Sequence, residues 1–226
     1  MGTKNFSYGI WPGTKTGIIC KIVFVILFLI VTIPIADARD LDKPSMSYRG
    51  YDKHNREFIK KYISTNKGNL TAVKKRSGHA LHLIDSVFKS DKLPGQLKYL
   101  AVVESELKTK AVSKAGAAGP WQLMPETAKI LGLKVSAHHD DRLNLIKSTR
   151  AAALHLKGLH EEFPDWLLSI AGYNCGDLTV YNAIKNAGSS NYWAVKKYLP
   201  KETQEYVAKY LATCYFFDGG CNFASR

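Results

Sequence analysis

The stretch LPGQLKYLAVVESEL, Leu93 to Leu107, places a carboxylate where its helical pattern calls for an apolar side chain. Apolar residues recur there at intervals of three and four, the spacing of one face of an α-helix, at Leu93, Leu97, Leu100 and Leu107. Glu104 falls on this same face and is expected to point toward the core. Glu106 lies about 200° further round, toward solvent. Pro94 suits the first turn of this helix.

A carboxyl group on a buried helical face has a definite chemical use. Burial disfavours the charged form and raises the pKa, so Glu104 can hold a proton near neutral pH and donate it. The alternative is a helix-end glutamate that is simply hydrogen-bonded or paired with a lysine. The spacing alone leaves both interpretations open.

The rest of the sequence indicates an all-α fold. From Asn55 onward helical patterns dominate, and the alternating pattern of strands is scarce. We expect a short helix at 58–62 and further helices at 79–88, 125–132, 148–163, 165–176, 178–187 and 201–217. Pro125 is expected in a first turn, Gly132 and Gly176 at helix ends, and Ser148 as an N-cap.

The N-terminus has the layout of a secretory signal peptide. Three lysines precede the apolar run IVFVILFLIVTI, which at about 12 residues is short for a membrane span of about 20. The small-x-small sequence ADA at 36–38 then follows, as before a signal-peptidase cut. We predict a protein exported to the periplasm or cell envelope, with an uncleaved membrane anchor as the alternative. The predicted parts are a signal peptide (1–38), a linker (39–54), a helical lead-in (55–92), the main domain (93–217) and a tail (218–226).

The chain is strongly basic, with a formal net charge of +13. Residues 1–38 contain three lysines and one aspartate, so their removal leaves a net charge of +11. Such a charge attracts polyanions. Export makes an anionic cell-envelope surface the expected partner and argues against nucleic acid.

Cysteines and histidines offer few metal or disulfide signals. An exported protein can form disulfides, and Cys214–Cys221 is the nearest pair in sequence among the cysteines after residue 38. Whether the two pair stays open. No CxxC or HExxH spacing occurs, and the segment HHDD at 138–141 is more typical of an exposed loop than of a metal site. We expect neither a metal nor another cofactor.

Two further polar residues interrupt apolar helical faces. Asn174 follows Leu167 and Ile170 at helical spacing, with Tyr173 beside it. Tyr206 shares a face with apolar residues of the last helix. Together with Glu104 and an exposed-looking turn at Trp121, they suggest a polar cleft between helices, lined by aromatic side chains as sugar sites are. Each alone is more often an ordinary hydrogen-bonded core residue.

The combined motifs resemble the lysozyme-like (SLT-type) lytic transglycosylases, closest to their membrane-bound lytic murein transglycosylase D type. The resemblance covers about residues 55–217. It rests on the patterns ES, GAxGxWQ, YNxG and ETxxYV in this order and spacing, which are Glu104-Ser105, Gly116-Ala117-Ala118-Gly119-Pro120-Trp121-Gln122, Tyr173-Asn174-Cys175-Gly176 and Glu202-Thr203-Gln204-Glu205-Tyr206-Val207.

The resemblance implies a role for each matching residue. Glu104 corresponds to the single catalytic acid, and Tyr206 to a tyrosine whose hydroxyl approaches it. Glycine at 116 and 119 would let the loop backbone pass close to the glycan. The remaining matches are expected to border the scissile bond or hold the sugar and the glutamate, and they are Ser113, Gln122, Met124, Tyr173 and Asn174.

The implied activity is non-hydrolytic cleavage of the β-1,4 bond between N-acetylmuramic acid and N-acetylglucosamine in peptidoglycan strands, by a monomer. Glu104 would act as acid and then as base, giving 1,6-anhydromuramoyl ends. One alternative is a muramidase of goose-lysozyme type, in which Asp140 or Asp141 orients a water. The other is a wall-binding module without turnover.

Overall fold

The computed structural model describes residues 53–221 and 223. These residues all belong to one compact unit. The predicted signal peptide, 1–38, and residues 39–52 of the predicted linker lie outside the described residues. Among the helices of the described part, none combines the length and the apolar character needed to cross a bilayer.

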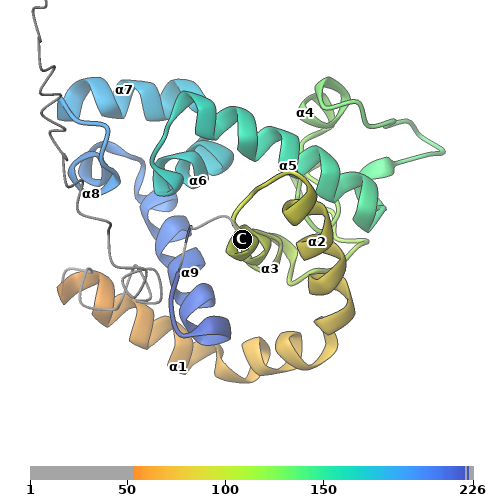
Figure 1. Cartoon of the computed structure of the whole chain (residues 1–226), viewed down its shortest axis with the longest axis horizontal. Helices are drawn as coiled ribbons and strands as arrows, with labels where there is room; N and C mark the ends of the chain where they lie inside the picture. Colours follow the sequence, from red (N-terminus) through yellow and green to blue (C-terminus); the bar gives the residue numbers. More distant parts are fainter. Residues whose placement is uncertain (1–52, 222, 224–226) are drawn as a thin grey trace, which may run out of the picture. The chain divides into compact units, whose positions relative to one another are not determined.

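The described part is helical, as the sequence predicts, and its only β-type pairings are isolated bridges such as Val112 with Ala118. Figure 1 shows the arrangement. The α-helices are α1 (Lys53–Arg76), α2 (Gly78–Ser90), α3 (Tyr99–Ser105), α4 (Pro125–Ile130), α5 (Leu145–Glu162), α6 (Trp166–Cys175), α7 (Asp177–Ala187), α8 (Tyr192–Val195) and α9 (Lys201–Asp218).

Helices α3, α6 and α9 form the centre of the unit. Helix α9 packs on both α3 and α6, while α6 also contacts α5 and α7. On the predicted face of the 93–107 stretch, Leu93, Leu97 and Leu100 are buried as expected, whereas Leu107 is only partly buried. Packing α3 against α9 brings residue 104 of one helix next to residue 206 of the other.

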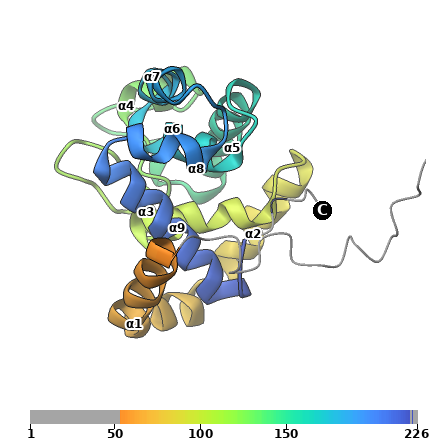
Figure 2. The ribbon, with the colours of Figure 1, turned by 90° about the vertical axis from the view of Figure 1, so that its left-hand side faces the viewer.

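Helix α1 is much longer than the expected helix at 58–62. It runs along α9, and the two lie side by side in both ribbon views (Figures 1 and 2). Only a narrow set of its side chains is buried, including Ile59, Leu70 and Val73. The many polar residues between these positions hide the periodicity that a longer prediction would need.

Two local predictions about helix ends are wrong. Pro94 does not begin an α-helix, because a 3-10 helix, Gly95–Lys98, precedes α3, as often happens at helix starts. Ser148 is not an N-cap: α5 begins three residues earlier, and the Asn144 side chain accepts a hydrogen bond from the Lys147 amide. Ser148 lies within the helix, where its hydroxyl donates to the Asn144 carbonyl.

Other helix ends agree with the sequence. Pro125 begins α4, and Gly132 follows it with a φ of +83°. Asp165 caps α6 by accepting from the Leu167 amide, and Gly176 ends that helix. Cys214 and Cys221 are both buried free thiols in this structure.

Candidate active site

Glu104 lies in the last turn of α3 with its carboxyl group directed at α9. The Tyr206 hydroxyl donates a hydrogen bond of 2.6 Å to Glu104 Oε1. Burial raises the pKa of Glu104 from 4.5 to about 7, and the bond from Tyr206 opposes only part of this rise. Near neutral pH the side chain therefore interconverts between acid and carboxylate, as a group that gives and then takes a proton must.

Two tyrosines surround this carboxyl group. Tyr206 is only 7% exposed, and Tyr173 donates a hydrogen bond of 2.8 Å to the Trp121 carbonyl. Burial raises the pKa of both phenols well above the usual range, and the charge of Glu104 adds to the rise. Both hydroxyls therefore stay protonated and act as hydrogen-bond donors. The Tyr206 hydroxyl donates its hydrogen bond to Glu104.

Trp121 is a core residue, which corrects the expectation that it lines an exposed turn. Its side chain is fully buried, and its indole N–H donates to Thr149 Oγ1 at 2.9 Å. Its ring also packs on Phe88. The Trp121 side chain therefore anchors the loop from residue 108 to residue 124 on the body of the fold. Its backbone carbonyl accepts the hydrogen bond from Tyr173.

The same loop is hydrogen-bonded both to α3, which carries Glu104, and within itself. Ser105 Oγ, next to Glu104, donates to the Pro120 carbonyl at 2.9 Å. Gln122 has a left-handed backbone with a φ of +45°, and its amide N–H2 donates to the Gly119 carbonyl at 2.8 Å. Ser113 Oγ accepts from the Ala117 amide. Both predicted glycan-binding side chains, Ser113 and Gln122, thus have partners within the loop, whereas Met124 is 39% exposed.

Arg142 is hydrogen-bonded to carbonyl groups of this loop, a role that the sequence did not predict. Its guanidinium is buried, and Nη1 donates to the carbonyls of Gly116 at 2.7 Å and Leu123 at 2.9 Å. Asp140 pairs with the same guanidinium at 2.8 Å. The sequence signal for this pair is the spacing of Asp140 and Arg142, because oppositely charged residues two apart in an irregular segment can form an ion pair. Gly119 packs against the Arg142 backbone, which corrects the expectation that it makes room for a glycan.

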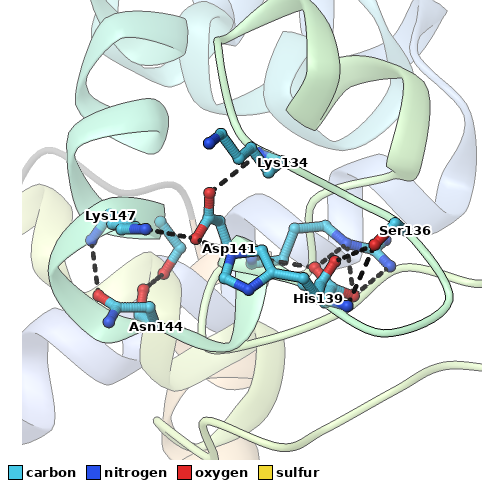
Figure 3. A network of polar contacts seen from close by, with 9 residues as sticks. Lys134, Ser136, His139, Asp141, Asn144 and Lys147 are labelled. Atoms are coloured by element: carbon cyan, nitrogen blue, oxygen red, sulfur yellow. Dashed lines mark hydrogen bonds and ion pairs between the residues drawn. The ribbon is translucent and has the colours of Figure 1, made fainter.

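Asp141 belongs to a separate structural network, which Figure 3 shows. It accepts hydrogen bonds from Lys147 Nζ at 2.6 Å and from the Lys134 amide at 3.0 Å, and it contacts His139 Nε2 at 2.7 Å. The bond from Lys147 is the main cause that lowers the Asp141 pKa. Within residues 53–221 and 223, no three His, Cys, Asp or Glu side chains are grouped as a metal site would need.

Asn174 does not lie on a buried face, contrary to the sequence prediction. It is exposed, and its Oδ1 accepts a hydrogen bond of 2.9 Å from Thr203 Oγ1. Helix α6 ends one residue later, so no further turn covers the position. Thr203, to which sequence reasoning gave no role, thereby joins the end of α6 to the first turn of α9, three residues before Tyr206.

Comparison with known proteins gives sequence relatives that share this region. Residues 88–196 match the transglycosylase SLT domain family. The membrane-bound lytic murein transglycosylase D of Escherichia coli (strain K12) is 38% identical over 162 residues, which is 70% of this chain and 35% of that protein. A peptidoglycan transglycosylase of Escherichia phage T7 is 41% identical over 83 residues, covering 36% of this chain and 6% of its own.

Solved structures share the fold. The 70 kDa soluble lytic transglycosylase of Escherichia coli matches with a TM-score of 0.53 and 22% identity, over 77% of this chain and 31% of that chain. The 70 kDa soluble lytic transglycosylase in complex with bulgecin A matches with a TM-score of 0.58 and 21% identity, over 76% and 30% of the two chains.

The described residues form a lysozyme-like helical domain, the fold of these two structures, and Glu104 lies in it with its pKa raised. The chain carries a transglycosylase SLT domain at residues 88–196. It spans about a third of the length, 35%, of the membrane-bound relative.

Proposed function

We propose that this protein is a lytic transglycosylase, a lyase that cleaves the β-1,4 bond between N-acetylmuramic acid and N-acetylglucosamine in peptidoglycan and leaves 1,6-anhydromuramoyl ends. The observation that carries the proposal is the state of Glu104. Its pKa of about 7 and its bond to Tyr206 suit one residue for both donating and accepting a proton. The names of the sequence relatives support the same substrate.

The reaction needs only this one carboxyl group. Protonated Glu104 donates its proton to the glycosidic oxygen as the bond to carbon 1 of the muramoyl sugar breaks. The carboxylate so formed then takes the proton from the hydroxyl on carbon 6 of the same sugar. That oxygen bonds to carbon 1, which regenerates the acid and consumes no water. The Tyr206 hydroxyl stabilises the intermediate carboxylate by its hydrogen bond.

The other nearby carboxylates have structural partners, which supports a mechanism with a single acid. Most glycosidases use a pair of carboxylates about 5–9.5 Å apart. Glu106 is bound by Asn69, Arg76 and Lys108. Asp140 pairs with Arg142, so neither it nor Asp141 is free to orient a water as the muramidase alternative requires.

Fragment masses test the proposal. Purified protein incubated with isolated sacculi is expected to release muropeptides that carry anhydro ends and are lighter by one water per cut than hydrolysis products. Fragments with reducing ends would instead identify a muramidase. Binding to sacculi without any release of fragments would identify a wall-binding module.

We also propose that the protein is exported and acts as a monomer at an anionic cell-envelope surface, in the periplasm or in association with a membrane. Helix α1 supports such a surface, because it carries eight Lys or Arg residues against one Glu. Four exposed lysines recur near a seven-residue spacing and so lie along one side of the helix; this basic stripe comprises Lys60, Lys67, Lys74 and Lys75.

Charge reversal on the basic stripe is expected to weaken envelope binding. The double substitution Lys67→Glu and Lys75→Glu should lower affinity for sacculi or anionic phospholipid vesicles, since each lysine near an anionic surface contributes about 1 kcal/mol. Sedimentation at rising salt concentration measures the effect, which should shrink as salt screens the charges. Lys129→Glu with Lys185→Glu makes the same charge change on α4 and α7. Equal losses in both pairs would show that net charge, and not α1, governs binding.

A further inference from the structure

Helix α3 ends in an unusual backbone turn two residues after Glu104. Glu106 and Leu107 both have left-handed backbones, with φ of +54° and +61°. The Glu106 amide donates to the Val102 carbonyl at 2.9 Å and the Leu107 amide to the Ala101 carbonyl at 3.1 Å. The two bonds span four and six residues, so this turn is one residue wider than the Schellman motif with its 5→2 and 6→1 bonds. Like that motif, it ends the helix with a left-handed residue, a position that glycine usually occupies. A side chain there costs about 1 kcal/mol per residue, so something must hold Glu106 in place.

Helix α1 supplies the contacts that hold it. Arg76 Nη2 donates to the Glu106 backbone carbonyl at 2.9 Å and lies 3.5 Å from its Oε2. Asn69 Nδ2 donates to Glu106 Oε1 at 2.7 Å. We call the contacts of Asn69 and Arg76 with Glu106 the α1 clasp. From the other side Lys108 Nζ contacts Oε2 at 2.9 Å, so both the backbone and the side chain of Glu106 are fixed.

The α1 clasp acts on the turn of α3 that carries Glu104. Ala101 and Val102, whose carbonyls accept the two closing hydrogen bonds, lie on the turn that leads to Glu104. If Glu106 left the left-handed conformation, both bonds would open and the last turn of α3 would be free to unwind. The bond from Tyr206 to Glu104 is only 2.6 Å long, and a shift of about 1 Å in a catalytic group can cost a hundredfold in rate.

We propose that Asn69 and Arg76 are positioning residues for Glu104, acting through Glu106. The inference rests on the proposed function, because it assigns Glu104 the proton transfer. It goes beyond the family match, which begins at residue 88 and leaves α1 outside. In this proposal α1 contributes to the geometry of the active site. The two residues that connect α1 to Glu106, Asn69 and Arg76, are polar and exposed.

Packing of α1 by itself would predict a different behaviour. The helix is anchored on α9 by buried apolar residues such as Leu70 and Val73. The Arg76 side chain is 45% exposed, so its removal leaves those contacts in place. A variant that slows catalysis without loosening α1 therefore separates positioning from structural support.

Arg76→Ala tests the clasp in kinetics. We expect kcat to fall about tenfold with KM nearly unchanged, and the thermal midpoint to stay near that of the parent protein. Water entering beside a loosened Glu104 lowers its raised pKa, so the alkaline limb of the pH profile should move to lower pH. Arg76→Lys should recover part of the rate. Lys61→Ala, an equal charge loss at another exposed position of α1, is the matched control and should leave kcat unchanged.

Glycine at position 106 provides the decisive comparison. A glycine adopts a positive φ without strain, so only Leu107 remains strained and the turn depends much less on the clasp. Arg76→Ala should then have little further effect in the Glu106→Gly background, although it slows the parent protein. Equal rate losses in both backgrounds, or no loss in the parent protein, would overturn the proposal.

Amide hydrogen exchange gives a readout that does not depend on activity. Arg76→Ala should speed exchange at the amides of residues 106 and 107 in the parent protein and not in the Glu106→Gly background. Unchanged protection in the parent protein would contradict the clasp. A parent protein that forms no anhydro products yet shows this exchange pattern would overturn the proposed function while leaving the structural role of the clasp standing.

Discussion

Glu104→Gln is expected to abolish the release of anhydro fragments from peptidoglycan while the protein keeps its fold and its binding to sacculi. The amide can neither donate a proton to the glycosidic oxygen nor take one from the sugar hydroxyl. General acid–base catalysis contributes about 10²–10⁴-fold to a rate, and here one residue serves both steps. Glutamine has nearly the same size and can still accept the hydrogen bond from Tyr206. Mass spectrometry of released muropeptides measures the loss.

The parent protein should show the titration of the same group in its pH dependence. In the proposed mechanism, bond cleavage needs protonated Glu104, whose pKa is about 7. Activity should therefore be high below this pH and fall as the pH rises through it, approaching a tenfold loss per pH unit well above it. A profile that stays flat to about pH 9 would mean that Glu104 does not act as the acid.

Stability gives an independent check with a definite sign. The folded-state pKa of Glu104, about 7, lies above the unfolded value of 4.5. Its contribution to stability is therefore present below pH 4.5 and is lost as the pH rises through 7. Glutamine is neutral throughout, so Glu104→Gln should match the parent protein near pH 4 and be more stable near pH 8. The gain is at most about 3.5 kcal/mol, from about 1.4 kcal/mol for each pKa unit.

Thermal unfolding at several pH values tests this sign. Glu161→Gln, which removes an exposed glutamate on α5, is the matched control and should leave both the stability profile and the fragments unchanged. If Glu104→Gln still released anhydro fragments, another residue would have to supply the acid. If its stability profile followed that of the parent protein, Glu104 would not be desolvated.

Local sequence signals predict the class of fold and the helix ends that depend on neighbouring residues. Pro125 and Asp165 begin helices because their own chemistry suits a first turn or a cap. Gly132 and Gly176 end helices because a positive φ costs them little. The position of Glu104 also follows from local spacing, since the face that it shares with Leu97 and Leu100 is buried.

Contacts between distant segments could not be predicted in the same way. Trp121 in a polar loop could be exposed or buried, and only its bond to Thr149 in α5 decides which. Asn174 has helical spacing to Ile170, but the helix ends before that face is covered. Arg142 supports a loop through carbonyl groups that lie 26 and 19 residues earlier in the chain. These features depend on which surfaces meet, and that information is not carried by the periodicity of one helix.

Gly119→Ala is expected to disrupt the loop from residue 108 to residue 124 and to cause the largest loss of stability among these substitutions. Gly119 has a φ of +78°, and a Cβ there would lie 1.9 Å from the Arg142 carbonyl oxygen. This neighbour is backbone and cannot rotate away. A strained φ with a backbone clash should cost about 3 kcal/mol or more in the free energy of unfolding, measured by urea denaturation.

Gly116→Ala separates the clash from the conformational cost alone. Gly116 also has a positive φ, +88°, but a Cβ there would meet no atom within 4 Å, so its cost should be about 1 kcal/mol. At Gly119 the strain can be relieved only by moving residues 119–122 away from Arg142. That movement displaces the Pro120 carbonyl, which holds Ser105, and the Trp121 carbonyl, which holds Tyr173. Gly119→Ala should therefore lose fragment release even where the protein remains folded, whereas equal effects of the two substitutions would contradict the close packing of this loop on Arg142.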